Sequence, residues 1–176
     1  KKIQQKYNTF SISVSHTTRK PRPNEVDGVD YFFTSETDFK KFINNGKFYE
    51  YAKIFGNYYG TSKDNVNKLI KTKDILFDID WQGTKQLSKF KNLNLIKIYL
   101  LPPSKKELKN RLIKRNQESE EEVAKRFKAY DEDILHWKDY DYVLINENLE
   151  NCYKQIEKII SINKNTNSLF HKTQWF

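Results

Sequence analysis

Three apolar segments decide the fold class: "DILFDID" (residues 74–80), "LIKIYLL" (95–101) and "YDYVLIN" (140–146). Each has the length of one strand and is apolar enough to be buried on both faces. Helical patterns fill the chain between them. This alternation predicts an α/β domain with a mostly parallel sheet flanked by helices, whose ligands lie beyond the carboxyl ends of the strands.

Shorter elements precede this core. Residues 1–7 have the pattern of the end of a basic helix, and residues 10–15, 31–33 and 48–54 have that of strands. Phe39, Phe42 and Ile43 share one face of a predicted helix, and another helix is expected over residues 64–72. "FGNYYGTS" predicts turns at Gly56 and Gly60. No Gly/Ser linker divides the 176 residues, so we expect a single domain.

Composition limits the partners. A formal net charge of +9 favours anionic ligands, with nucleic acid, membrane surfaces and phosphorylated small molecules all eligible. Cys152 is the single cysteine, which excludes a disulfide framework and favours a reducing compartment. No apolar run approaches the roughly 20 residues that a membrane span needs. These features predict a cytoplasmic protein and leave its oligomeric state open.

A loop rich in arginine is the first candidate site. In "HTTRKPRPNE", Pro21 and Pro23 restrict the backbone that carries Arg19 and Arg22. A guanidinium binds phosphate oxygens through two parallel hydrogen bonds, so this pair could clamp one terminal phosphate. Two ordinary surface arginines are the alternative.

Glu50 is the second candidate, since it lies among aromatic residues on a predicted strand. A carboxylate in that place is costly unless donors satisfy it. The N1–H and N2 amino groups of guanine form an adjacent pair of donors that fits. Tyr58 and Tyr59 follow on the predicted turn, where a phenol could reach a phosphate. An edge strand with aromatic packing is the alternative.

Residues 104–133 form a third, highly charged segment. Ser104 is placed to cap its first helix, with Glu107 three residues later. Arg111 and Arg115 lie one turn apart on the same helical face, with Arg126 further on. Three arginines in such a segment could neutralise transferring phosphates. A solvated helix with salt bridges to neighbouring glutamates is the alternative.

Asp78 and Asp80 end the first apolar segment, two residues apart and therefore on one side of a strand. Carboxylates at such strand ends commonly reach a ligand or the water shell of a cation. Capping of the following helix is the competing interpretation.

Together these residues resemble a guanylate kinase. The signature loop of that family is matched by Thr17, Thr18, Arg19, Arg22, Glu25, Gly28 and Tyr31. The similarity continues through "FYEYAKIFGNYYGTS", "ILFDIDWQG", "IYLLPPS" and "RLIKR" followed by "KRF". The resemblance implies a P-loop kinase core with a small GMP-binding lobe (residues 15–64) and a helical lid (104–128). It also implies a nucleotide-binding transferase of purine metabolism that passes the γ-phosphoryl group of ATP to GMP or dGMP with Mg²⁺.

The resemblance also assigns roles to residues. The GMP phosphate or its surroundings would be contacted by Ser15, Arg19, Arg22, Tyr31 and Tyr59. Guanine would be read by Glu50, Thr61 and Asp80. The ATP phosphates and the developing charge would be met by Arg111, Arg115 and Arg126, with Arg19 also catalytic, and Asp78 would lie near the magnesium shell. Small molecules are the implied partners, with neither nucleic acid nor a membrane.

One part of the family pattern is missing from these residues. The glycine-rich loop that ends in Gly-Lys-Ser/Thr does not occur in residues 1–176. Because residues 1–10 resemble the end of the helix that follows that loop, we expect it upstream of Lys1 and treat the chain as N-terminally truncated. A non-catalytic guanylate-kinase-like module that binds phosphopeptides is the alternative function. The complete set of lid arginines argues against it.

Overall fold

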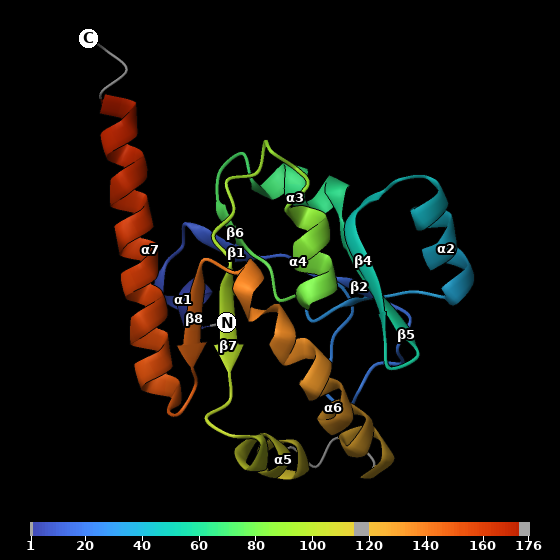
Figure 1. Cartoon of the computed structure of the whole chain (residues 1–176). Coiled ribbons are helices and arrows are strands. Elements are labelled where there is room, and N and C mark those ends of the chain that lie inside the picture. The colour runs from blue at the N-terminus through green and yellow to red at the C-terminus, as the bar shows by residue number, and fades with distance from the viewer. Residues whose placement is uncertain (1, 115–119, 173–176) are drawn as a thin grey trace.

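The structure is a computed structural model that describes residues 2–114 and 120–172, and it confirms the α/β class (Figure 1). The strands are β1 (Phe10–Ile12), β2 (His16–Thr17), β3 (Phe32–Phe33), β4 (Phe48–Ile54), β5 (Asn57–Ser62), β6 (Asp74–Leu76), β7 (Ile98–Leu101) and β8 (Tyr142–Ile145). The helices are α1 (Lys2–Lys6), α2 (Glu36–Asn44), α3 (Lys63–Leu69), α4 (Trp81–Leu87), α5 (Lys105–Lys114), α6 (Glu120–Asp133), a 3₁₀ helix (Ile134–Asp139) and α7 (Leu149–Lys172).

Two parallel strand pairs form the part of the molecule predicted from the apolar segments. β1 pairs with β6, and β7 pairs with β8. Each strand is shorter than its apolar segment: β6 ends at Leu76 rather than at residue 80. α7 lies alongside β8 (Figure 1) and is tied to α1, because Lys6 Nζ and the Tyr7 hydroxyl both donate to Glu157 Oε1 at 2.7 Å.

A separate four-stranded sheet has the order β3-β2-β5-β4, and we call it the small sheet. α2 covers its outer face (Figure 1). Ser35 caps this helix by accepting a hydrogen bond from the Asp38 N–H at 3.1 Å. The fully buried Phe39 lies 4.6 Å from the Phe48 ring and 5.3 Å from the Tyr58 ring, centroid to centroid. This aromatic layer fixes which face of the small sheet is left for a ligand.

Gly60 does not form the predicted turn. It lies within β5, where a Cβ would stand 3.0 Å from the Phe39 ring and 3.1 Å from the Glu50 carbonyl oxygen. The glycine therefore provides space for α2 to approach the sheet closely. Tyr58 and Tyr59 consequently point to opposite faces of a strand, not out from a turn.

The turn at Gly56 is confirmed and has an unusual composition. Ile54 pairs with Asn57, so Phe55 and Gly56 are the two central residues of the hairpin between β4 and β5. Both have positive φ, 48° and 87°, as a type I′ turn requires. Asparagine is the usual residue before the glycine, and a bulky side chain held at positive φ costs about 1–3 kcal/mol. Phe55 therefore stores strain at the tip of the hairpin.

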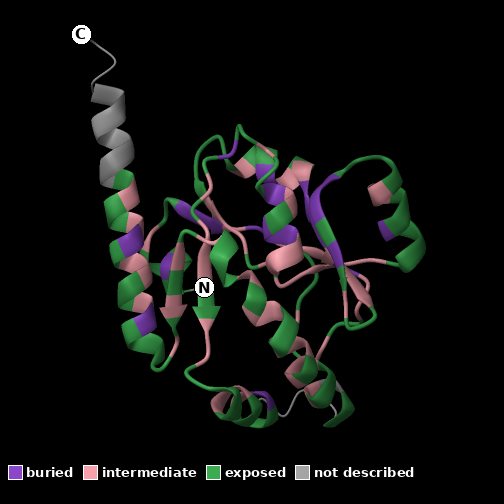
Figure 2. Ribbon diagram, in the orientation of Figure 1, coloured by how far each residue is buried: buried purple, intermediate pink, exposed green. Residues whose placement is uncertain are grey.

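α4 joins the small sheet to the rest of the core. Tyr49, Val66, Leu87 and Leu93 form one buried cluster at this junction. Figure 2 colours the buried residues of the chain purple. The side-chain amide of Gln86 also bonds to the outer edge of β4. Its Nε2 donates to the Tyr51 carbonyl oxygen at 2.7 Å, and its Oε1 accepts from the Tyr51 N–H at 3.2 Å. Helix and strand are thus held together by both apolar packing and backbone hydrogen bonds.

Candidate active site

The arginine loop is folded around Glu25. Arg19 Nη2 donates to both Glu25 carboxylate oxygens, at 2.8 and 3.0 Å, and the Arg22 N–H donates to Glu25 Oε2 at 2.7 Å. Partial burial would raise the pKa of Glu25, but the hydrogen bonds from Arg19 and Arg22 hold it below its usual range. Arg19 is only 14 % exposed, so its guanidinium is already oriented in the free protein.

Tyrosines surround this guanidinium. Arg19 Cζ lies 5.3 Å from the centroid of the Tyr31 ring, and the Tyr31 and Tyr59 rings are 6.1 Å apart. Burial raises the pKa of Tyr31 above its usual range, and the nearby Tyr59 and Asp78 add to the rise. The structure therefore brings Arg19, Tyr31, Tyr59 and Asp78 into one neighbourhood, although they come from four separate segments.

Strand pairing aligns the predicted guanine residues with this neighbourhood. Tyr59 and Thr61 are two residues apart on β5, and so they share a face. Glu50 pairs with Thr61, and Thr17 pairs with Tyr59. Residues directly opposite in an antiparallel pair point the same way. One face of the small sheet thus carries Glu50 and Thr61 beside Tyr59, and α2 covers the other face.

Glu50 is 3 % exposed, and burial raises the pKa of its carboxyl from 4.5 to about 7. Thr61 opposes this rise, and the Asp80 carboxylate adds to it. Because the folded state holds this proton more tightly than the unfolded chain does, Glu50 costs the fold stability as the pH rises from about 4.5 to about 7. The contacts from Thr61 therefore leave the buried charge of Glu50 only partly stabilised.

Thr61 has the same deficit. Its Oγ1 is buried and has no hydrogen bond of good geometry with any of the described residues, which is rare in a folded protein. Ser13 Oγ and His16 Nδ1 are the other buried side-chain atoms in this state within the described chain. A buried carboxyl whose charge is only partly stabilised, next to a hydroxyl without a well-formed hydrogen bond, is what a polar ligand would satisfy.

Asp80 serves as the cap of α4. Its Oδ1 accepts from the Gly83 N–H at 2.9 Å, and its Oδ2 accepts from Gln82 Nε2 at 3.1 Å. Because β6 ends at Leu76, strand alternation does not align Asp78 with Asp80, contrary to the sequence-based expectation. Each carboxylate instead acts on a different part of the site: Asp78 raises the pKa of Tyr31, and Asp80 raises the pKa of Glu50.

Gly83 was missed by the reasoning from sequence. A Cβ at this position would lie 2.6 Å from Glu50 Oε2, so only glycine allows the carboxyl to rest on the first turn of α4. A signal was present in the sequence, since glycine is unfavourable inside a helix and then indicates close approach of another group.

Arg111 and Arg126 line a second region, a cavity of about 380 Å³ with Tyr99 and Tyr130 among its other lining residues. Arg111 Nε donates to Glu107 at 2.8 Å, and its Nη1 donates to the Asn146 carbonyl oxygen at 2.8 Å, just after β8. Arg126 lies over the Phe55 ring, with Cζ 5.3 Å from the ring centroid. The cavity therefore meets the carboxyl ends of β7 and β8, where an α/β sheet commonly binds ligands.

For three of the predicted site residues, Arg115, Ser15 and Arg22, the structure gives little or no side-chain geometry. Arg115 lies outside the described residues. Ser15 is partly buried, and its carbonyl oxygen accepts from the Phe32 N–H at 2.9 Å. Arg22 contributes its backbone N–H to Glu25. Ser104 caps α5 as expected, accepting from the Glu107 N–H at 3.1 Å.

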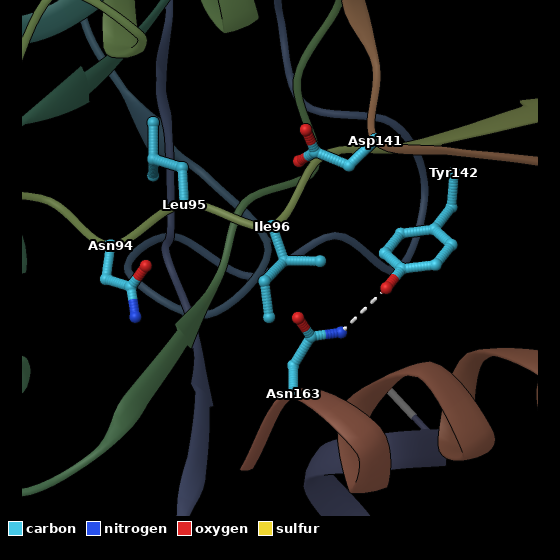
Figure 3. A pocket seen from close by; sticks show the side chains of 6 residues that line it. All are labelled: Asn94, Leu95, Ile96, Asp141, Tyr142 and Asn163. Atoms are coloured by element: carbon cyan, nitrogen blue, oxygen red, sulfur yellow. Dashed lines mark hydrogen bonds between the residues drawn. The ribbon is translucent and has the colours of Figure 1, made fainter. Parts of the chain in front are cut away.

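Another cavity, of about 280 Å³, lies away from these groups, where α7 faces the loop before β7 (Figure 3). Asn163 Nδ2 donates to the Tyr142 hydroxyl across it at 3.2 Å, and the rest of the lining combines Asn94 and Asp141 with Leu95 and Ile96. Nothing in its lining suggests chemistry.

Within residues 2–114 and 120–172, no three His, Cys, Asp or Glu side chains gather as a metal site, and no helix is long and apolar enough to cross a membrane. Asp78 therefore stands alone as the predicted acid near magnesium. One carboxylate together with substrate phosphates is a usual environment for Mg²⁺ in phosphoryl transfer, so the residues present fit that ion.

The sequence model of the family "Guanylate kinase" matches residues 1–163. Guanylate kinases from Novosphingobium aromaticivorans and Rickettsia prowazekii are 41% and 43% identical over 92% and 94% of this chain, which are 73% and 84% of their own lengths.

A solved structure gives the same result. The crystal structure of guanylate kinase from Anaplasma phagocytophilum matches with a TM-score of 0.74 and 31% identity, covering 89% of this chain and 77% of its own. The family model, the relatives and the solved structure agree, and the chain belongs to the guanylate kinase family.

Proposed function

We propose that the protein transfers the γ-phosphoryl group of ATP to GMP or dGMP, giving ADP and GDP or dGDP. This is the reaction of the family to which the chain belongs. The observation that carries the proposal is the shared face of the small sheet, on which Glu50 and Thr61 lie beside Tyr59 and its contact with Tyr31. A purine ring and its 5′-phosphate span two such adjacent sites. We assign residues 15–64 to the GMP lobe and residues 104–128 to the lid.

Guanine recognition is assigned to Glu50, with Thr61 and Asp80 in support. The N1–H and N2 amino groups of guanine supply two further donors to the buried carboxyl. The donors favour the ionised form, so guanine binding lowers the pKa of Glu50 and releases its proton when the pH is below about 7. Adenine presents an acceptor at N1 and would leave the carboxylate unsatisfied.

The phosphate of GMP is assigned to the arginine loop. Arg19 Nη2 already donates to both carboxylate oxygens of Glu25, and the same guanidinium could donate to the oxygens of a phosphate. The phosphate can share or replace that partner without reorganising the loop, and Tyr31, Tyr59, Arg22 and Ser15 complete its surroundings.

The ATP side is assigned to Arg111, Arg126 and Arg115, with Arg19 on the acceptor side of the transferred group. Their charges neutralise the oxygens of the phosphoryl group as the bond to GMP forms. Mg²⁺, when bound with ATP, supplies further charge neutralisation at the phosphates, and Asp78 is the carboxylate placed to face its water shell. The remaining work of the chain is to position the two nucleotides in line and to exclude water.

The compartment and partners follow from this assignment. ATP and GMP or dGMP are the small-molecule partners, and a single buried thiol, Cys152, suits a reducing cytoplasm. We propose no nucleic-acid or membrane partner.

A coupled assay of ADP release by the full-length protein tests the function. Turnover is expected with ATP and GMP, much less with AMP in place of GMP, and turnover should be unchanged in Lys40→Gln, a variant on the outer surface of α2. Turnover at background level together with tight binding of a phosphopeptide would instead support the non-catalytic module, which no observation on this chain favours.

A further inference from the structure

The strained tip of the β4–β5 hairpin requires a reason. Asn-Gly would form this type I′ turn without penalty, yet the chain places Phe55 before Gly56, at a φ of 48°. The side chain does not compensate by burial in the lobe, since it remains 40 % exposed. Strain that local packing does not explain points to a function for the residue.

The contact made by this ring crosses between the two assigned regions. The Phe55 ring lies under the Arg126 guanidinium, with Cζ 5.3 Å from the ring centroid. Phe55 belongs to the hairpin that also carries Glu50 and Tyr59, whereas Arg126 belongs to α6. Both side chains line the cavity of about 380 Å³ that also contains Arg111.

We propose that Phe55 is a positioning residue for Arg126 in phosphoryl transfer. This inference rests on the proposed function, in which Arg126 meets the ATP phosphates. The face of an aromatic ring attracts a guanidinium through the ring electrons and does not itself accept in the plane of the N–H groups. The ring thus holds the plane of Arg126 from the side of the GMP lobe and competes with no phosphate oxygen for its donors.

The proposal also gives a reason for the position of Phe55 at the tip of the hairpin. The tip of a hairpin moves together with the strands that it connects. A shift of the GMP lobe would therefore also shift Phe55 relative to α6. Correct placement of the acceptor nucleotide on β4 and β5 is then accompanied by correct placement of an arginine on the donor side.

Phe55→Asn in the full-length protein separates this role from a structural one. Asparagine suits the turn, so the melting temperature should equal or exceed that of the wild type by up to about 4 °C. The kcat should nevertheless fall about 2- to 30-fold, the range expected for loss of one cation–π contact. The KM for GMP should stay within about twofold, because no guanine contact is removed.

Two more variants and a double-mutant cycle complete the test. Phe55→Tyr keeps the ring and should retain the wild-type kcat, whereas Phe55→Leu keeps the bulk and should lose as much as Phe55→Asn. In an Arg126→Ala background, Phe55→Leu should cause no further loss.

An unchanged kcat in Phe55→Asn or Phe55→Leu, or additive losses in the cycle, would overturn the inference. The inference would also be overturned if Phe55→Leu lowered both the melting temperature and kcat and Phe55→Tyr lowered them as well. Absence of ATP:GMP turnover in the wild type would instead refute the proposed function.

Discussion

The GMP lobe and the lid differ in how much of their chemistry is built before a substrate arrives. In the lobe, Glu50 and Thr61 are buried, and Arg19 is oriented by two hydrogen bonds to Glu25. In the lid, Arg111 is about one-third exposed, and it donates to Glu107 of its own helix and to the carbonyl oxygens of Asn146 and Glu147. In the proposed assignment, recognition of the base relies on a desolvated site, whereas neutralisation of phosphate charge relies on arginines that lie along exposed helices.

This contrast predicts different kinetic signatures for the two regions. Substitutions in the lobe should act mainly on KM for GMP, since they alter binding of the ground state, and substitutions in the lid should act mainly on kcat. The four experiments below are ordered by the size of the effect.

Arg111→Ala should lower kcat by about 10²–10³-fold, the cost typical of removing one preorganised donor to developing charge. KM for GMP should change little. Because Arg111 also bonds to the carbonyl oxygens of Asn146 and Glu147, the melting temperature must be measured alongside, with Arg111→Lys as the variant that keeps the charge. Equal changes in kcat and KM would place Arg111 outside the transfer site. They would also contradict the predicted difference between the kinetic effects of lobe and lid substitutions.

Glu50→Gln should raise KM for GMP by about 5- to 150-fold, equivalent to about 1–3 kcal/mol for an unmatched pair of donors. The same variant should be no less stable than the wild type at pH 8, because an amide carries no charge to desolvate. Glu36→Gln on the exposed side of α2 is the matched control. A wild-type KM in Glu50→Gln would remove this residue from the guanine site.

Gly83→Ala should raise KM for GMP by about tenfold, since the new methyl group would displace Glu50 Oε2 from its position 2.6 Å away. Alanine otherwise favours helix, so a loss of affinity without a loss of helix content identifies the clash. Lys85→Ala, on the exposed side of the same helix, should leave KM unchanged. If Gly83→Ala binds GMP normally, the lobe is less rigid than proposed.

The affinity for GMP should fall about fourfold between pH 8 and pH 6.5, as a carboxyl with a pKa of about 7 takes up its proton. Calorimetry in two buffers of different ionisation enthalpy should detect a proton released on binding at pH 6.5. Glu50→Gln should abolish both effects. A proton release that persists in that variant would assign it to another group.

Much of this organisation could be predicted from the sequence. The α/β class follows from the alternation of apolar strands with helices, and the Ser104 cap and the hairpin at Gly56 follow from local chemistry. In the lobe, side-chain chemistry singled out Arg19, Arg22 and Glu50, and the match to the family then assigned their roles; periodicity gives no information about loops.

The remainder depended on tertiary contacts. A glycine inside a strand pattern suggests a turn, and only the packing of Phe39 shows that Gly60 leaves room for α2. The early end of β6 and the position of Gly83 against Glu50 are likewise set by groups that are distant in sequence. The role of Arg115 stays a prediction.

The side-chain amide of Gln86 has a further consequence for β4, the outermost strand of the small sheet. An outer strand offers unpaired N–H and C=O groups to which another polypeptide can add. By bonding both groups of Tyr51, Gln86 acts as a one-residue substitute for a neighbouring strand. The lobe can therefore keep a flat, ligand-binding sheet while its rim is closed to association with a second molecule at this point.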